Sequence, residues 1–434
     1  MPTATEATNL VSKAANSNEP ARPRLAAVDG LRPLLTMWVI IFHLGVPKES
    51  HSFAGHLLDM LARRGWIAVD CFFCMSGFFE RYTQREGGQS PRRKLLALVL
   101  RCAPAYYASM LLALLVVPHS AYTALQVALY TLGLQTWLPI ILTSDHPPHK
   151  EVYLPFSVNA PAWFVASLVW VVLLHALVAS QERLSPYLAP TRVIPCLFAI
   201  LICSFLRVLP SYLWGFGLVP HTFGASSSLG LVPSASIPLF GTDGSYARLT
   251  LFCSSKVPPG IFYVWPLSNI LSYWAGGYAA QLTSLLMGRG LMASRMWQFV
   301  DAGCLLVFLL TIAMPGAQLL FPNSPHSTSG HTALICLFLI STTAEKSGLI
   351  VRALSHPVLV ALSPATLAAY LFAWPINNMT AQVTERSILF LPTYFILLWA
   401  LAVFWAECVE GPWVKLVLPR VMSSLPPGGG NSSA

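Results

Sequence analysis

The sequence predicts an all-α, polytopic membrane protein with about ten transmembrane helices in one bundle, and three observations support this. Of the 434 residues, 55% are hydrophobic and only 10% are charged, with a mean hydropathy of +0.61, which no ordinary soluble domain shows. Apolar runs long enough to cross a bilayer recur along nearly the whole chain. Basic residues cluster between these runs, as they do in cytoplasmic loops. The net charge of +9 therefore reflects membrane orientation rather than nucleic-acid binding.

Eleven segments are candidate membrane helices. They are residues 31–46, 65–80, 97–117, 121–142, 161–180, 192–210, 264–287, 298–317, 329–345, 358–378 and 387–408. The positive-inside rule places every basic cluster in the cytoplasm, but five crossings between Lys94 and Arg289 would leave the later cluster outside. We therefore expect one of these five candidates not to cross, which leaves ten crossings and two cytoplasmic termini.

The chain divides into one membrane domain with polar extensions. Residues 1–28 form a polar cytoplasmic extension without the apolar run of a signal peptide, residues 29–415 form the transmembrane domain, and residues 416–434 are expected to be a disordered tail. Residues 211–263 form a long extracytoplasmic loop within the domain. The sequon at Asn378 also falls outside, where glycosylation is possible. Most of the nine cysteines lie in apolar runs without metal-binding spacing, so no metal is predicted.

The first candidate helix, with the sequence "DGLRPLLTMWVIIFHLG", contains two ionisable side chains at membrane depth. Arg32 and His43 are separated by eleven residues, so they share one helix face to within about 20° and lie about 16 Å apart along it. Charged groups within a membrane are costly and usually face a bundle interior or a watery cavity. The pair therefore indicates a functional site.

Two more ionisable residues follow in the next two candidate helices. Asp70 lies in the apolar run "GWIAVDCFFCMSGFF", near the small residue Ser76, and Arg101 lies two turns beyond the basic cluster that ends at Lys94. Two guanidinium groups near the cytoplasmic end suit a cytosolic ligand that carries phosphate. A histidine deeper in the membrane suits a general base.

These motifs resemble the integral membrane acyltransferase 3 family, in which an R-x10-H pair is followed by a "GxxVDxFFxxSGF" helix and an "RxxPxY" helix. Later segments are similar to further family blocks in the same order. They are "APAWFVASLVW" (Ala160–Trp170), "PLSNILSYWAGGYAAQL" (Pro266–Leu282), "LSPATLAAYLFAWPI" (Leu362–Ile376) and "VEGP" (Val409–Pro412). The resemblance covers nearly the whole chain, and the family core has ten helices.

The resemblance implies a membrane-bound O-acyltransferase that moves an acyl group, usually acetyl, from acyl-CoA to a hydroxyl of a sugar, a lipid or a secondary metabolite. It implies that His43 is the base, that Arg32 and Arg101 bind the donor, and that Asp70, Ser76 and Trp163 support the site. Acyl-CoA is then a co-substrate, with no permanently bound cofactor. Direct transfer is expected, although Ser76 is the nearest hydroxyl for an acyl-enzyme route.

Two departures from the family pattern affect the acceptor side of the site. No acidic residue follows Trp163 closely, and Ala373 stands where relatives carry histidine. The main alternative function is a proton-coupled multi-span transporter. We see no repeat between residues 31–210 and 264–408, and the interior charges cluster in the first three helices, which favours the enzyme. An inactive scaffold is disfavoured by the intact Arg32 and His43. The sequence favours a eukaryotic endomembrane but leaves endomembrane and plasma membrane open as locations.

Overall fold

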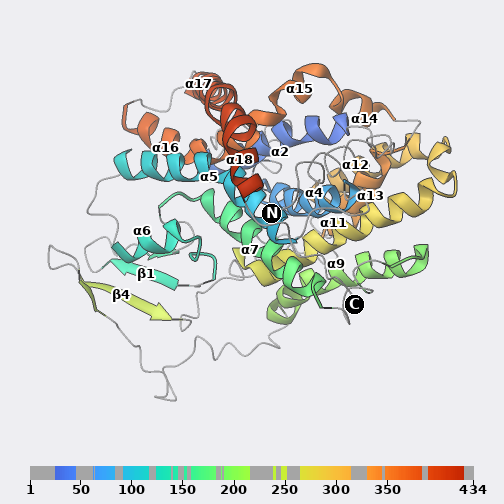
Figure 1. Ribbon diagram of the computed structural model, residues 1–434, viewed down its shortest axis with the longest axis horizontal. Coiled ribbons are helices and arrows are strands. Elements are labelled where there is room, and N and C mark those ends of the chain that lie inside the picture. The colour runs from blue at the N-terminus through green and yellow to red at the C-terminus, as the bar shows by residue number, and fades with distance from the viewer. Residues whose placement is uncertain are drawn as a thin grey trace, which may run out of the picture.

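The computed structural model describes residues 25–44, 62, 64–83, 91–116, 124–137, 140–144, 151–153, 158–181, 187, 190–215, 238–240, 246–251, 264–313, 330–344, 348–383 and 390–424. The described part is mainly a bundle of helices (Figure 1). These are α2 (Ala26–Leu44), α4 (Ile67–Tyr82), α5 (Pro91–Val116), α6 (Ala124–Thr131), α7 (Ala162–Ala179), α9 (Val193–Gly215), α11 (Pro266–Met287), α12 (Trp297–Ala313), α13 (Thr332–Ser341), α14 (Leu349–Leu354), α15 (Pro357–Leu362), α16 (Thr366–Val383), α17 (Phe390–Trp405) and α18 (Leu418–Ser424).

Short helical turns connect some of these elements. η4 (Leu291–Ala293) and η6 (Ser363–Ala365) are 3₁₀ turns, while η7 (Ala406–Glu410) and η8 (Trp413–Val417) are π-helical turns that join α17 to α18. Such π-helical turns are rare and widen the helix locally. The indole Nε1 of Trp413 donates a hydrogen bond to the carbonyl oxygen of Leu100 at 2.7 Å, which fixes η8 against α5.

Several helices are long and apolar enough to cross a membrane, as expected. Within the described residues there are five such segments: Ala26–Leu44, Arg93–Val116, Ala162–Ala179, Pro357–Thr380 and Pro392–Ser424. Three shorter apolar helices are Val193–Leu209, Trp297–Thr311 and Thr332–Ser341. Large apolar side chains such as Leu115, Phe198 and Phe299 are exposed on the outer face of the bundle, where a bilayer would cover them.

The candidate segment 121–142 contains a helix of only eight residues, α6. Eight residues rise about 12 Å, less than half of the roughly 30 Å of a hydrocarbon core. After α6 the chain turns through Gly133, which has a φ of 66°, and then enters a strand. This helix is therefore too short to cross, and it belongs to the five candidates between Lys94 and Arg289, of which one is expected not to cross.

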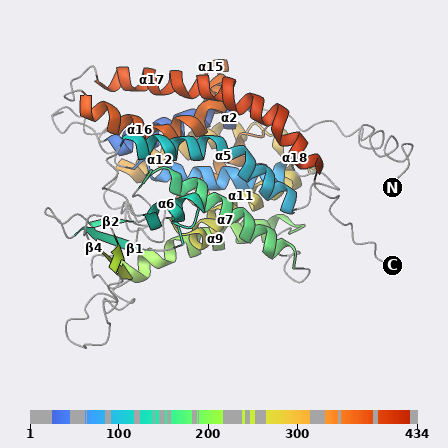
Figure 2. The ribbon, with the colours of Figure 1, turned by 60° about the vertical axis from the view of Figure 1, so that its left-hand side comes forward.

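A small sheet, which was not predicted, lies outside the bundle. Its strands are β1 (Ile140–Ser144), β2 (Glu151–Tyr153), β3 (Pro238–Phe240) and β4 (Tyr246–Leu251), arranged as an antiparallel sheet in the order β2-β1-β4-β3. Figure 2 shows it at the end of the bundle opposite α18. Pairing of β1 with β4 requires residues 140–144 and 246–251 to lie on the same side of the membrane, which is consistent with crossings by both α7 and α9 between them.

Some predicted boundaries need correction. α2 begins at Ala26, within the expected N-terminal extension, and α9 continues to Gly215, into the expected loop 211–263. Helix α18 occupies Leu418–Ser424, within the expected disordered tail 416–434, because an apolar stretch continues past Pro412. Residues 1–24 and 425–434, and all of the loop 216–263 apart from β3 and β4, lie outside the described residues.

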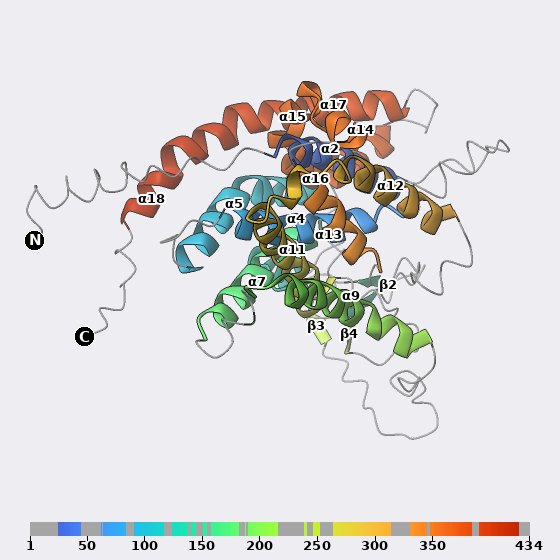
Figure 3. The same ribbon diagram turned by 90° about the vertical axis from the view of Figure 1, so that its right-hand side faces the viewer.

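Helices α4 and α11 pack together closely near the centre of the bundle (Figure 3). A Cβ atom added at Gly77 would clash with the carbonyl oxygen of Tyr273, and one added at Gly276 would clash with the carbonyl oxygen of Cys74. Small residues of this kind allow the backbones of two membrane helices to touch. The Gly77 and Gly276 contact therefore sets the distance between the two central helices.

We predict that Gly77→Ala and Gly276→Ala each lower the free energy of unfolding by about 1–3 kcal/mol. The added methyl group would clash with a backbone carbonyl of the facing helix, and the helix backbone would have to shift to make room. The midpoint of thermal unfolding in detergent measures this. Gly303→Ala in α12 is the matched control, since an added Cβ there meets no atom within 4 Å, and alanine is the better helix former. Equal midpoints for Gly77→Ala and Gly303→Ala would contradict the prediction.

Candidate functional site

A cavity of about 680 Å³ opens beside α2, α4, α5, α7, α11 and the segment η8–α18. It is lined by Arg32, Ser76, Phe79, Glu80, Thr83, Lys94, Ala97, Leu98, Arg101, Leu168, Val172, Tyr273, Val414 and Leu418. Three of these residues are cationic and one is acidic, so we call it the basic cavity. The sequence predicts that Arg32, His43, Asp70 and Arg101 share one interior; of these four, Arg32 and Arg101 line the basic cavity and His43 and Asp70 do not.

Arg32 lies at the edge of the basic cavity. Its guanidinium carbon lies 4.9 Å from the centre of the Phe79 ring, a cation–π arrangement. One guanidinium nitrogen is 3.7 Å from Oδ1 of Asp29, one turn earlier in α2. These contacts hold the Arg32 side chain across the space between α2 and α4, where it can meet an anionic group in the cavity.

Lys94 and Glu80 form a second polar group on the wall of the basic cavity. The Lys94 ammonium donates to Oε1 of Glu80 at 3.2 Å, and Nε2 of His175 lies 3.9 Å from Oε2 of Glu80. The indole Nε1 of Trp274 donates to Nδ1 of His175 at 3.0 Å. Because Lys94 neutralises Glu80 and Arg101 is exposed at the cavity, the lining carries a net positive charge suited to an anion.

His43 lies in a different and much smaller space, of about 10 Å³, lined by Ile40, His43, Leu44, Pro161, Ala373, Trp374, Asn377 and Tyr394. The centres of the His43 and Trp374 rings are 6.3 Å apart. This volume holds about one water molecule. Arg32 therefore contacts α4 whereas His43 contacts α16, and the structure does not place both residues in one open cavity.

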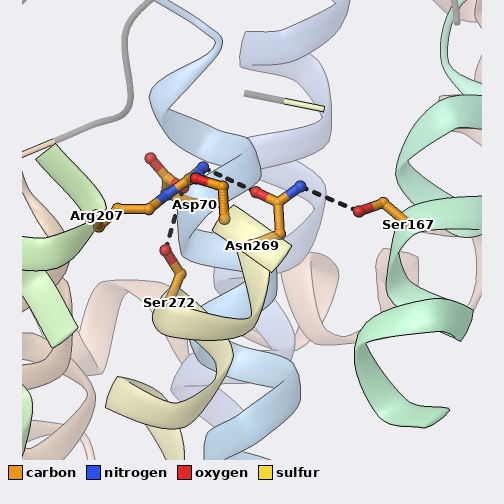
Figure 4. Close-up of polar contacts among 6 residues, drawn as sticks. Asp70, Ser167, Arg207, Asn269 and Ser272 are labelled. Atoms are coloured by element: carbon orange, nitrogen blue, oxygen red, sulfur yellow. Dashed lines mark hydrogen bonds and ion pairs between the residues drawn. The ribbon is translucent and has the colours of Figure 1, made fainter. Parts of the chain in front are cut away.

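Asp70 is completely buried in an ion pair that sequence reasoning missed. Oδ1 of Asp70 accepts a hydrogen bond at 2.9 Å from Nη2 of Arg207, in α9, and both side chains are fully buried (Figure 4). The expectation that the interior charges cluster in the first three helices is therefore wrong. The signal was present in the sequence, since Arg207 is a single arginine in the apolar run "LICSFLRVLP".

The ion pair belongs to a network of polar side chains from four helices, as Figure 4 shows. Arg207 also donates to Oδ1 of Asn269 at 2.8 Å and to Oγ of Ser268. The Asn269 amide donates to Oγ of Ser167 at 3.0 Å, and Oγ of Ser272 lies 3.3 Å from Asp70. The network joins α4, α7, α9 and α11, so the structure gives Asp70 a role in holding helices together, away from the lining of the basic cavity.

The supporting residues Ser76 and Trp163 have different surroundings. Oγ of Ser76 donates to the carbonyl oxygen of Phe72 at 2.8 Å, within α4, so its proton is engaged by the backbone although the residue lines the cavity. Trp163 is fully buried, with its ring centre 6.4 Å from that of Phe164. Both contacts suit packing, and an acyl-enzyme at Ser76 stays an untested alternative.

Asp301 and His331, two further ionisable residues in or beside the apolar helices, have hydrogen-bond partners. Asp301 accepts hydrogen bonds from the backbone amides of Ala302 and Val351, at 2.7 and 3.1 Å. His331 is hydrogen-bonded to Oγ1 of Thr311 at 2.8 Å. Asn378 lies within α16, and Oγ1 of Thr380 bonds to the carbonyl oxygen of Ile376 at 2.9 Å. Glycosylation of Asn378 stays a prediction.

Comparisons of the chain with protein-family models, with curated proteins and with solved structures gave no match. The resemblance to the acyltransferase family therefore rests on the order and spacing of the motifs. The roles that the resemblance implies for Arg32, His43 and Arg101 stay predictions.

We predict that removing one partner of the buried ion pair is much worse than removing both. Asp70→Asn or Arg207→Gln should each destabilise the protein by about 3–5 kcal/mol, because an uncompensated charge or polar group is left in a dry interior. The double variant should recover part of this loss. A double-mutant cycle of unfolding midpoints in detergent measures the coupling, and strictly additive effects would contradict a direct interaction.

Proposed function

We propose that the chain is a membrane-bound O-acyltransferase that moves an acyl group, foremost acetyl, from acyl-CoA to a hydroxyl of a small molecule, lipid or glycan. The observation that carries the proposal is the basic cavity, in which Arg32, Lys94 and Arg101 surround about 680 Å³ at one end of the bundle. CoA carries several phosphates, and guanidinium groups bind phosphate with strong, charge-assisted hydrogen bonds.

We further propose ten membrane crossings, by α2, α4, α5, α7, α9, α11, α12, α13, α15–α16 and α17–α18. Three observations support this count: α6 is too short to cross, β1 pairs with β4 on one side, and the basic clusters then all lie in the cytoplasm. In this topology the basic cavity opens to the cytoplasm, where acyl-CoA is made, and His43 lies toward the opposite side.

In the proposed reaction the imidazole of His43 accepts the proton of the acceptor hydroxyl while the oxygen attacks the thioester carbonyl carbon. The carbon–sulfur bond then breaks, and the imidazolium returns the proton to the CoA thiolate. General base catalysis by a positioned histidine contributes typically about 10²–10⁴-fold to the rate. Because His43 lies some 16 Å along α2 from Arg32, the phosphates and the thioester would occupy opposite ends of the same helix.

A proton-coupled transporter is the second candidate, and one observation favours it. The Asp70–Arg207 pair is completely buried between four helices, and buried ionisable pairs of this kind occur in proton relays. A transporter would need Asp70 and Arg207 for turnover but would not hydrolyse a thioester. The two functions can therefore be separated by assaying chemistry directly.

We predict slow hydrolysis of acetyl-CoA by the purified protein in detergent, with water as the acceptor. His43→Ala should reduce this rate by about 100-fold or more, since the base is lost. His356→Ala is the control, because His356 is exposed and lines neither space. If neither acetyl-CoA nor a longer acyl-CoA is hydrolysed or bound, the acyltransferase proposal is wrong and the transporter becomes the better candidate.

We also predict that Arg32→Ala and Arg101→Ala each weaken CoA binding by about tenfold or more, because each removes a charge-assisted hydrogen bond to phosphate. Isothermal titration with CoA measures the affinity. Arg295→Ala removes an exposed arginine that lies outside the cavity lining. A loss of affinity equal to that of Arg32→Ala would show that net charge alone is responsible.

A further inference from the structure

Helices α2 and α16 pack together and carry three polar side-chain atoms that are buried without a hydrogen-bond partner in the described part of the chain. They are Oγ1 of Thr36, the hydroxyl of Tyr370 and Oδ1 of Asn377. The three residues are 1%, 4% and 9% exposed. A buried polar atom without a partner costs free energy, and a bilayer offers no water to replace the missing partner.

Thr36 lies on the helix face that carries Arg32 and His43, and Asn377 of α16 lies beside His43. On α2, Thr36 is one turn beyond Arg32 and two turns before His43, so these three residues share a face. On α16, Tyr370 and Asn377 are seven residues apart and share a face too. Tyr370 belongs to the same core as Leu35 and Val39 of α2, and Asn377 lines the small space around His43.

A polar row therefore leads from the basic cavity, at Arg32, to the small space at His43. The space itself holds only about one water molecule, so a ligand that follows this row must part the side chains between α2 and α16. Both helices carry an internal proline, Pro33 in α2 and Pro375 in α16. Each proline removes a backbone hydrogen bond of its helix, which makes a local bend easier.

We propose that Thr36, Tyr370 and Asn377 form the binding route for the pantetheine arm of the acyl-CoA donor, an inference that rests on the proposed function. The arm carries two amide groups and one hydroxyl. The hydroxyls of Thr36 and Tyr370 can each donate and accept, while Oδ1 of Asn377 accepts from an amide N–H. The unpaired atoms thus match a ligand that must cross an apolar interior while keeping its polar groups hydrogen-bonded.

The test compares variants of similar shape that lack the unpaired polar atom. Thr36→Val, Tyr370→Phe and Asn377→Leu should leave the unfolding midpoint of the ligand-free protein unchanged or raised, because each deletes an unsatisfied buried group. Each variant should raise the KM for acetyl-CoA hydrolysis by about three- to tenfold, the usual effect of one lost neutral hydrogen bond. If these polar atoms instead stabilised the fold, each variant would lower the unfolding midpoint.

Matched controls come from buried hydroxyls that have partners. Oγ1 of Thr283 donates to the carbonyl oxygen of Ala279 at 3.0 Å, and the hydroxyl of Tyr106 donates to the backbone carbonyl oxygen of Tyr130 at 2.6 Å. Thr283→Val and Tyr106→Phe should therefore lower the unfolding midpoint and leave the KM unchanged. If Thr36→Val and Tyr370→Phe behave like these controls, the route is wrong.

A second probe separates the arm from the nucleotide. Adenosine 3′-phosphate 5′-diphosphate is CoA without pantetheine, so Thr36→Val and Tyr370→Phe should not change its affinity, whereas Arg32→Ala should weaken it. If the wild-type protein hydrolyses acetyl-CoA but the three variants keep its KM, only the route fails. If the wild-type protein neither binds nor hydrolyses any acyl-CoA, the proposed function and the route fail together.

Discussion

The buried ion pair between Asp70 and Arg207 is the constraint on which the arrangement of the bundle depends. Neither side chain is exposed, and the carboxylate and guanidinium meet at 2.9 Å between α4 and α9. Leaving either charge alone in this interior would cost several kcal/mol, so the two helices have one acceptable rotation relative to each other. Ser167 of α7 and Asn269 of α11 extend the same requirement to two more helices.

The basic cavity depends on this rotation because its residues lie on the same helices. Asp70 and the cavity residues Ser76, Phe79 and Glu80 all belong to α4, and the close contact of Gly77 with Tyr273 places α11 beside them. Fixing Asp70 inside the bundle turns the later part of α4 toward Arg32 and Lys94. The charged residues thus fall into two groups. Asp70 and Arg207 neutralise each other in the interior, whereas the cationic residues of the basic cavity line an open space.

Local patterns predicted the apolar helices and three residues that line the basic cavity, Arg32, Ser76 and Arg101. Hydropathy located the apolar helices, and the basic clusters predicted that one candidate segment does not cross. Helix α6, with eight residues, is too short to cross and fits this prediction. Arg32 and Arg101 were predicted to share a site because both lie near the basic ends of neighbouring helices. The β1–β4 pairing was not predicted, since it joins segments about a hundred residues apart.

The rest of the site could not be predicted because helix positions alone do not reveal pairing across the bundle. Arg207 was visible as a lone arginine in an apolar run, but its partner Asp70 is 137 residues away. Arg32 and His43 do share one face of α2, as predicted, but they contact different helices. Arg32 lies over Phe79 of α4, whereas His43 lies beside Trp374 of α16. Which helix lies opposite each turn of α2 decides whether two residues meet in one cavity.

The paired and unpaired polar atoms of the interior differ in what they can do. In the Asp70–Arg207 network the polar groups bind one another, which stabilises the bundle and leaves them little capacity for a ligand. Thr36, Tyr370 and Asn377 carry buried polar atoms with no partner in the described residues, so they lower the stability of the empty protein. A ligand that forms hydrogen bonds with these atoms would recover this free energy. The unpaired atoms would therefore make the ligand-bound protein more stable than the ligand-free protein.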